Sequence, residues 1–386
     1  MNTRKPELLI GVMAVFALGM FSCAPQPVEP TESSPEPEPS PTITIKHIVP
    51  TESIQEMPLS GLGDYPVGIR RNIIFYDENR SGREVILTIW YPAKGGQGEP
   101  GTSITDAEPE LSGAPYPVIL SSSKVGFIFA RSLVSHGFTY VGVNKIDSYP
   151  IYDNNLIDQP LDILFALKMM AENPPKGLDG VINTDIAGTI GYSFDAFNSL
   201  AMSGARIDPE AYLADCASAE IHVPIPPDWW IEYICTLSNN WADFEAHAGP
   251  AITESDNGLW QPITDARIKA VMPMGPEGAW IFNERGLTAV DRPVFLVSAE
   301  KDDLNIYDLE AAVLYDQIGF SEKYMVTILG KGHMMIYDPH VVDQMRHFAN
   351  AFFGYYLQGR DDYLDYFSED FVSQYGGLAW GVTQGE

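Results

Sequence analysis

The stretch DIAGTIGYSFDAFNSLAMSG, residues 185–204, joins an apolar run to a segment whose apolar residues recur at helical spacing. Gly191 stands near the junction, where a residue without a side chain lets the backbone turn sharply. Ser193 follows at the apex of the turn, so its hydroxyl is expected to be exposed above the end of a strand. Asp195 is unusual, because such turns normally carry a second glycine at this position.

The segments on either side of this turn predict the fold class. Strand-like segments rich in β-branched and aromatic residues occupy residues 72–77, 83–93, 116–123, 139–147, 185–193, 268–276, 293–303 and 324–333. Most of them end in small, polar or turn-forming residues, and the stretch from Leu156 to Met170 has helical periodicity. Alternating strands and helices predict an α/β fold with a mostly parallel, doubly wound sheet. Active sites of such sheets lie at the carboxyl ends of the strands.

The composition of the 386-residue chain limits its possible partners. Hydrophobic residues make up 45% of it, which is enough for a large core. The formal net charge of −29 argues against binding nucleic acid, whose phosphates require clusters of Lys and Arg. It also argues against electrostatic docking on anionic lipid and favours neutral or cationic ligands.

The N-terminal residues 1–22 have the pattern of an export signal. Two basic residues precede an apolar run, Leu8 to Phe21, that is short for a membrane span. Ser22-Cys23 resembles the lipobox of bacterial lipoproteins, in which Cys23 is lipidated; an ordinary signal peptide is the alternative. We therefore expect an exported lipoprotein, anchored to the membrane through its N-terminus and facing outside the cytoplasm.

The rest of the chain divides into a spacer and one domain. Residues 23–58 are rich in Pro, Glu and Ser and predict an extended linker, with the folded domain at 59–386. Residues 207–265 interrupt the alternation of strands and helices and contain several prolines and four tryptophans, which predicts a cap-like insertion over the carboxyl edge of the sheet. This insertion holds Cys216 and Cys235, and a pair of cysteines in an exported chain predicts a disulfide; two buried thiols are the alternative.

Three residues at strand ends form a candidate catalytic triad. A serine nucleophile needs a histidine that accepts its proton and a carboxylate that orients this histidine. Ser193, Asp302 and His333 each follow a predicted strand, in the chain order of α/β-hydrolases. Asp303 is the rival acid, because a shift of one residue at a strand end is common. The remaining histidines have no metal-type spacing, so we expect no metal site. Acyl transfer through a serine needs no cofactor, and we expect none.

The chain resembles a known family from about Gly63 to Phe371. The segments that carry the resemblance are GDYPVGIR, LTIWYPA, SHGFTYVGVN, DIAGTIGYSFDA, DARIKAVMPMGP, RPVFLVSAEKDD, GKGHMMIYD and FANAFFGYYLQG. They are similar to the dienelactone hydrolase branch of the α/β-hydrolases, which in turn resembles the platelet-activating-factor acetylhydrolases. The resemblance implies an α/β-hydrolase fold with Ser193 as nucleophile, where true dienelactone hydrolase has cysteine, Asp302 as acid and His333 as base. Cysteines are also common in the insertion of this branch.

Two positions depart from the family. The strand before the oxyanion loop usually ends in His-Gly, whereas this chain has Ser-Ser-Ser-Lys at residues 121–124. Because any residue except proline offers a backbone N–H, we expect the oxyanion to be bound by Ser123 or Lys124 together with Phe194. The second departure is Asp195. We expect its carboxylate to face away from the oxyanion and to bond first-turn N–H groups or Lys124, with an unpartnered surface acid as the alternative.

These expectations together predict a surface-anchored serine esterase or lipase. Its substrate would be a small-molecule or lipid carboxylic ester, cleaved through an acyl-enzyme on Ser193. The alternative within enzymes is a phospholipase A2-like acetylhydrolase that acts on short-chain or oxidised phospholipids. From another class, the alternative is a catalytically inactive surface binding protein on the same fold.

Overall fold

The computed structural model describes residues 56–97, 102–146, 151–222, 224–255 and 257–383. The predicted export signal 1–22, the lipidation site Cys23 and nearly all of the linker 23–58 lie outside these residues. Packing begins slightly before residue 59, because Met57 is already buried. The backbone N–H of Leu59 donates to His347 Nδ1 at 3.0 Å. No helix within the described ranges is long and apolar enough to cross a membrane.

The described residues form a ten-stranded sheet in the order β10-β9-β8-β7-β6-β4-β5-β2-β1-β3. The strands are β1 (Val67–Asp77), β2 (Arg83–Pro92), β3 (Ser103–Thr105), β4 (Tyr116–Ser122), β5 (Thr139–Val143), β6 (Ile182–Tyr192), β7 (Ile268–Met274), β8 (Val294–Ala299), β9 (Lys323–Ile328) and β10 (Leu378–Trp380). The six strands from β5 to β9 in this order are parallel, whereas β2 and β10 pair antiparallel with their neighbours. The predicted α/β fold with a mostly parallel sheet is confirmed, and the short edge strands β3 and β10 were not predicted.

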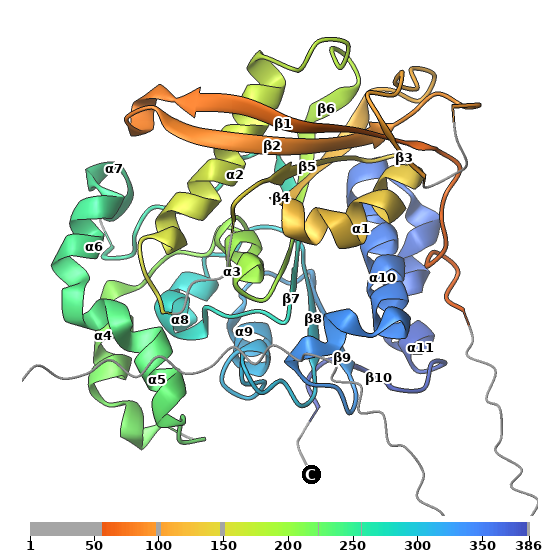
Figure 1. Ribbon diagram of the computed structural model, residues 1–386. Coiled ribbons are helices and arrows are strands. Elements are labelled where there is room, and N and C mark those ends of the chain that lie inside the picture. The colour runs from red at the N-terminus through yellow and green to blue at the C-terminus, as the bar shows by residue number, and fades with distance from the viewer. Residues whose placement is uncertain (1–55, 98–101, 147–150, 223, 256, 384–386) are drawn as a thin grey trace, which may run out of the picture. The chain divides into compact units, whose positions relative to one another are not determined.

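Helices cover both faces of the sheet, as Figure 1 shows. One face packs against α1 (Ser123–Ser135), α10 (Pro339–Gln358) and α11 (Glu369–Val372), and the other against α2 (Asn155–Glu172), α3 (Phe194–Ala201), α8 (Ala279–Leu287) and α9 (Ala311–Gln317). Short 3₁₀ turns are η1 (Glu78–Arg80), η2 (Ala219–Ile221), η3 (Cys235–Asn240), η4 (His333–Tyr337) and η5 (Asp361–Phe367). Alternation along each strand supplies both apolar layers: in β4, Ile119 faces α1 and α10, while Val118 and Leu120 face the opposite layer.

The insertion between α3 and β7 is helical. It contains α4 (Pro209–Ala217), α5 (Asp228–Ile234), α6 (Trp241–Ala248) and α7 (Pro250–Thr253). A disulfide between Cys216 and Cys235 joins α4 to the turn after α5, which confirms the predicted pairing. Trp230 and Trp260 are buried in the same apolar layer as α2, α3 and α8, so much of the insertion extends the core beside the sheet. Its α5 also reaches the carboxyl edge, because the carbonyl of Tyr233 accepts an N–H from the loop after β5.

Candidate active site

Ser193 occupies a sharp turn between β6 and α3. Its backbone lies at φ 61° and ψ −133°, in a region that residues with a side chain rarely adopt. The neighbouring strand β7 stabilises the turn, because the Ser193 N–H donates to the carbonyl of Met274 at 2.9 Å. Gly191 permits the close return of the chain, since a Cβ atom there would overlap the backbone carbonyl of Asp195. The structure therefore contains the strand–turn–helix unit predicted from the sequence.

The three predicted triad residues lie within hydrogen-bond distance of one another. His333 begins η4 after β9, and its Nε2 is 2.8 Å from the Ser193 hydroxyl oxygen. Its Nδ1 is 3.0 Å from both carboxylate oxygens of Asp302, which follows β8. His333 and Asp302 are only 4% and 5% exposed, whereas Ser193 is half-buried. The imidazole thus connects a protected carboxylate to a hydroxyl that remains partly accessible.

The two candidate acids make different contacts with the histidine. The carboxylate of Asp302 faces the imidazole, and its Oδ1 also accepts the backbone N–H groups of Leu304 at 3.1 Å and Asn305 at 2.9 Å. Asp303 contacts the same histidine differently: its Oδ1 accepts the backbone N–H of His333 at 3.4 Å. Asp302 is therefore the residue placed to orient the imidazole, whereas Asp303 contacts His333 through the backbone N–H.

Tyr192 provides a further link between the turn and the histidine. Its buried hydroxyl donates to the backbone carbonyl of His333. Burial is the main cause that raises the pKa of Tyr192, and the nearby charge of Asp302 adds to it, so the phenol remains a donor. The residue before the candidate nucleophile thus anchors the main chain of the candidate base.

The predicted oxyanion donors stand at the starts of two neighbouring helices. Phe194 is the first residue of α3, and Ser123 and Lys124 are the first two of α1. The two starts are close, because Lys124 Nζ lies 5.6 Å from the centre of the Phe194 ring. The Ser123 hydroxyl donates to the carbonyl of Gly142 at 3.0 Å, so its side chain is directed to the end of β5. Backbone N–H groups at helix starts attract developing negative charge.

The expectation for Asp195 is wrong in its partners. The side chain is 1% exposed, so it is not a surface acid. Its Oδ2 accepts from the Ser121 hydroxyl at 3.0 Å and from the Ser122 hydroxyl and N–H at 2.7 and 3.3 Å. Its Oδ1 accepts from the Asn198 amide at 3.0 Å. Neither first-turn N–H groups nor the Lys124 ammonium supply these bonds, because the carboxylate faces β4 and its own helix.

Two buried carboxyl groups beside the site were missed by the sequence analysis. Glu277 lies one residue beyond the segment predicted as a strand, and the Tyr233 hydroxyl is 3.1 and 3.2 Å from its two oxygens. Glu310 accepts the backbone N–H groups of Gly278 and Ala279 at 2.8 and 2.9 Å. Burial raises the pKa of Glu277 to about 8, and the charge of Asp302 contributes in the same direction. Burial also raises the pKa of Glu310.

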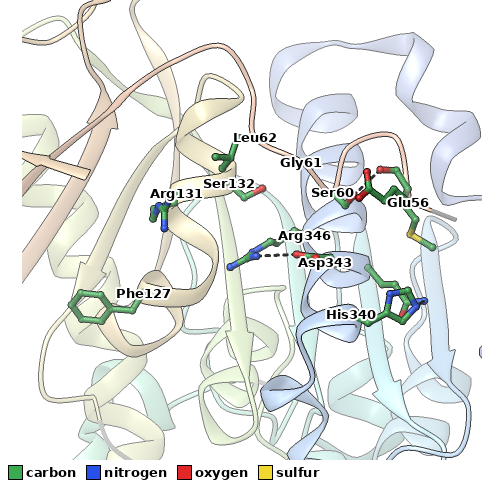
Figure 2. A pocket seen from close by; sticks show the side chains of 12 residues that line it. Glu56, Ser60, Gly61, Leu62, Phe127, Arg131, Ser132, His340, Asp343 and Arg346 are labelled. Atoms are coloured by element: carbon green, nitrogen blue, oxygen red, sulfur yellow. Dashed lines mark hydrogen bonds and ion pairs between the residues drawn. The ribbon is translucent and has the colours of Figure 1, made fainter. Parts of the chain in front are cut away.

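A cavity of about 600 Å³ lies elsewhere, between α1, α10 and the segment around Ser60 (Figure 2). It is lined by charged side chains that include Arg131 and an ion pair between Arg346 and Asp343 at 3.0 Å. None of the three triad residues is among its described lining residues. Across the described ranges, no group of three or more His, Cys, Asp or Glu side chains could hold a metal ion. The candidate active site is therefore the hydrogen-bonded cluster of Ser193, Asp302 and His333, and not this cavity.

No protein family matches the chain, and no curated protein matches its sequence.

Proposed function

We propose that the protein is a serine hydrolase that cleaves carboxylic esters through an acyl-enzyme on Ser193. The proposal depends on one observation above all: the His333 imidazole bridges the Ser193 hydroxyl at 2.8 Å and the Asp302 carboxylate at 3.0 Å. The positive φ of the serine and the chain order Ser, Asp, His support assignment of the domain to the α/β-hydrolase fold.

The geometry is suited to acyl transfer. With Nδ1–H donating to Asp302, the Nε2 atom of His333 can accept the Ser193 proton as the oxygen attacks the ester carbonyl. The N–H groups of Phe194 and of Ser123 or Lys124 would bind the oxyanion that forms. His333 then protonates the leaving alcohol, and the same histidine activates the water that hydrolyses the acyl-enzyme.

Exposed apolar side chains favour an ester with an apolar group. Leu304 follows the acid by two residues and is 48% exposed. Met334 and Tyr337, in the turn that begins with the candidate base, are 58% and 75% exposed. The net charge of −29 disfavours anionic substrates. Neutral carboxylic esters with an alkyl or acyl chain are thus the proposed substrate class, with the phospholipid acetylhydrolase as the alternative.

We also propose that the domain is exported and anchored by lipid at Cys23. This part of the proposal depends on the sequence of residues 1–23 alone. Expression of the full chain in a bacterial host, followed by membrane fractionation, tests it against a Cys23→Ser variant. Wild-type protein found only in the soluble fraction, with cleavage at another residue, would exclude the lipoprotein.

One experiment tests the enzymatic proposal. The purified protein is assayed with p-nitrophenyl acetate, butyrate and octanoate, and is treated with a fluorophosphonate whose attachment site is mapped by mass spectrometry. We expect turnover and labelling of Ser193, and Ser193→Ala should lower turnover by several orders of magnitude and abolish the label. A folded wild-type protein with neither turnover nor label would favour the inactive binding protein. Activity restricted to short-chain phospholipids would favour the acetylhydrolase.

A further inference from the structure

The side chain of Asp195 on α3 binds the end of β4 at the level where the pairing of β4 with β6 ends. The parallel pairing of β4 with β6 extends to Leu120 and Thr189 and goes no further. β4 continues for two residues, Ser121 and Ser122, and the hydroxyls of both donate to Asp195. The carboxylate therefore connects the end of β4 to α3, beyond the level at which β4 pairs with β6.

Both ends of this connection are helix starts. Ser122 is the N-cap of α1, and its hydroxyl oxygen also accepts the N–H of Val125 at 3.2 Å. Asp195 lies in the first turn of α3, two residues after Ser193. The Ser122 hydroxyl donates to Asp195 of α3 and accepts from the Val125 N–H of α1. The side chain of Asp195 therefore fixes the first turn of α1 through Ser122.

The carboxylate itself is held in one orientation. Asn198 donates to Asp195 Oδ1 at 3.0 Å and to Gln159 Oε1 of α2 at 3.1 Å. Gln159, Asp195 and Asn198 are all at most 4% exposed, so water cannot readily replace these bonds. Oδ1 thus accepts from Asn198 on α3, and Oδ2 accepts from the two serines at the end of β4.

We propose that Asp195 is a positioning residue that holds the oxyanion loop of α1 in register with the nucleophile turn. The inference rests on the proposed esterase function. One oxyanion donor, Phe194, precedes Asp195 directly, and the other, Ser123 or Lys124, directly follows the serines bound by its carboxylate. The bridge therefore sets the separation of two N–H groups that must converge on one oxygen atom. Displacement of either donor weakens stabilisation of the oxyanion more than binding of the ester.

The bridge depends on hydrogen-bond acceptors and not on a charge. An asparagine at position 195 would keep one oxygen for Ser121 and Ser122. Its amide nitrogen would face Asn198. If the amides of Asn198 and Gln159 both rotate by 180°, Asn198 offers an oxygen to this nitrogen and Gln159 offers an N–H to Asn198. We therefore expect Asp195→Asn to retain the loop position, whereas Asp195→Ala leaves two hydroxyls and two N–H groups without their acceptor.

The test compares Asp195→Ala, Asp195→Asn and Ser122→Ala with Ser132→Ala as the matched control. Ser132 is a buried serine near the other end of α1, and its hydroxyl oxygen accepts from the Asn350 amide at 2.8 Å. For each variant, kcat and KM for p-nitrophenyl butyrate, the inhibition constant of a trifluoromethyl ketone that forms a tetrahedral oxyanion, and Tm are measured.

We expect Asp195→Ala and Ser122→Ala to lower kcat by about 30- to 300-fold with KM changed less than about threefold. The inhibition constant should rise in parallel with the loss in kcat/KM, and Asp195→Asn should recover kcat to within about fivefold of wild type. Ser132→Ala should lower Tm while kcat stays within about twofold of wild type.

If Asp195→Ala lowers Tm but keeps kcat within about threefold of wild type, the residue is only structural and the inference is wrong. A loss of kcat in Asp195→Asn as large as in Asp195→Ala would also overturn it. A wild-type protein without turnover or fluorophosphonate labelling would instead refute the esterase proposal itself, and the inference with it.

Discussion

Replacement of Glu277 by glutamine should change how the stability of the protein depends on pH. The carboxyl is 2% exposed beside Tyr233, and its pKa is raised to about 8 from the ordinary value of 4.5. Between these two pKa values the folded protein binds one proton more at this group than the unfolded chain. The free energy of unfolding therefore falls as pH rises through this window, by about 1.4 kcal/mol per pH unit. Below pH 4.5 the contribution of Glu277 to the free energy of unfolding is fully present, and above about pH 8 this free energy falls no further through Glu277.

Glutamine is neutral throughout this range and can keep a hydrogen bond with the Tyr233 hydroxyl. Relative to wild type, Glu277→Gln should therefore be more stable at pH 8 than at pH 5, by on the order of 4 kcal/mol over three pH units. Urea unfolding followed by tryptophan fluorescence at each half unit from pH 5 to pH 9 measures this difference. Glu232→Gln is the matched control, because Glu232 is exposed on the same helix as Tyr233. Parallel curves for wild type and Glu277→Gln would refute the reasoning, since they would mean that Glu277 titrates alike in the folded and unfolded chain.

Three further predictions concern the site and the insertion. Asp302→Asn should lower kcat for p-nitrophenyl acetate by about 10³- to 10⁴-fold, because the imidazole loses its acceptor, whereas Asp303→Asn should stay within about threefold; the reverse order would assign the acid to Asp303. Gly191→Ala should lower Tm sharply and abolish turnover, since its Cβ would overlap the Asp195 carbonyl; a stable, active variant would show that the turn can relax. Replacing both cysteines of the insertion by alanine should cost about 3 kcal/mol in urea unfolding, from a loop with a sequence separation of 19; an unchanged midpoint would mean that the link adds nothing to stability.

The sequence predicted the parts of the fold that have a repeating pattern. All eight strands that it predicted are present. The six parallel strands read as buried apolar runs with defined ends, whereas the antiparallel strands β1 and β2 are marked by β-branched and aromatic residues on either side of a turn. The edge strands β3 and β10 have three residues each, too few for any period, and form only against an existing neighbour. Ser193, Asp302 and His333 were found because each follows such a run.

Contacts between distant segments could not be predicted in the same way. Ser121 and Asp195 are 74 positions apart, and no local pattern states that β4 and α3 meet there. Lys124 was an attractive partner because of its charge, but packing brings the hydroxyl groups of two serines to the carboxylate. Glu277 was missed for a related reason: a single acid in a loop gives no sign that the insertion will bury it.

The spacing of the triad along the chain also has a consequence for synthesis. Ser193 precedes His333 by 140 positions, and the strand that carries each lies on a different side of β7 and β8 in the sheet. At about 5–20 residues per second, a ribosome makes the serine on the order of 10 s before the histidine. During that interval the Ser193 hydroxyl lacks its proposed base, so we expect that the growing chain cannot become acylated by esters that it meets. The order of residues would thus delay the proposed esterase activity until almost the whole domain has been made.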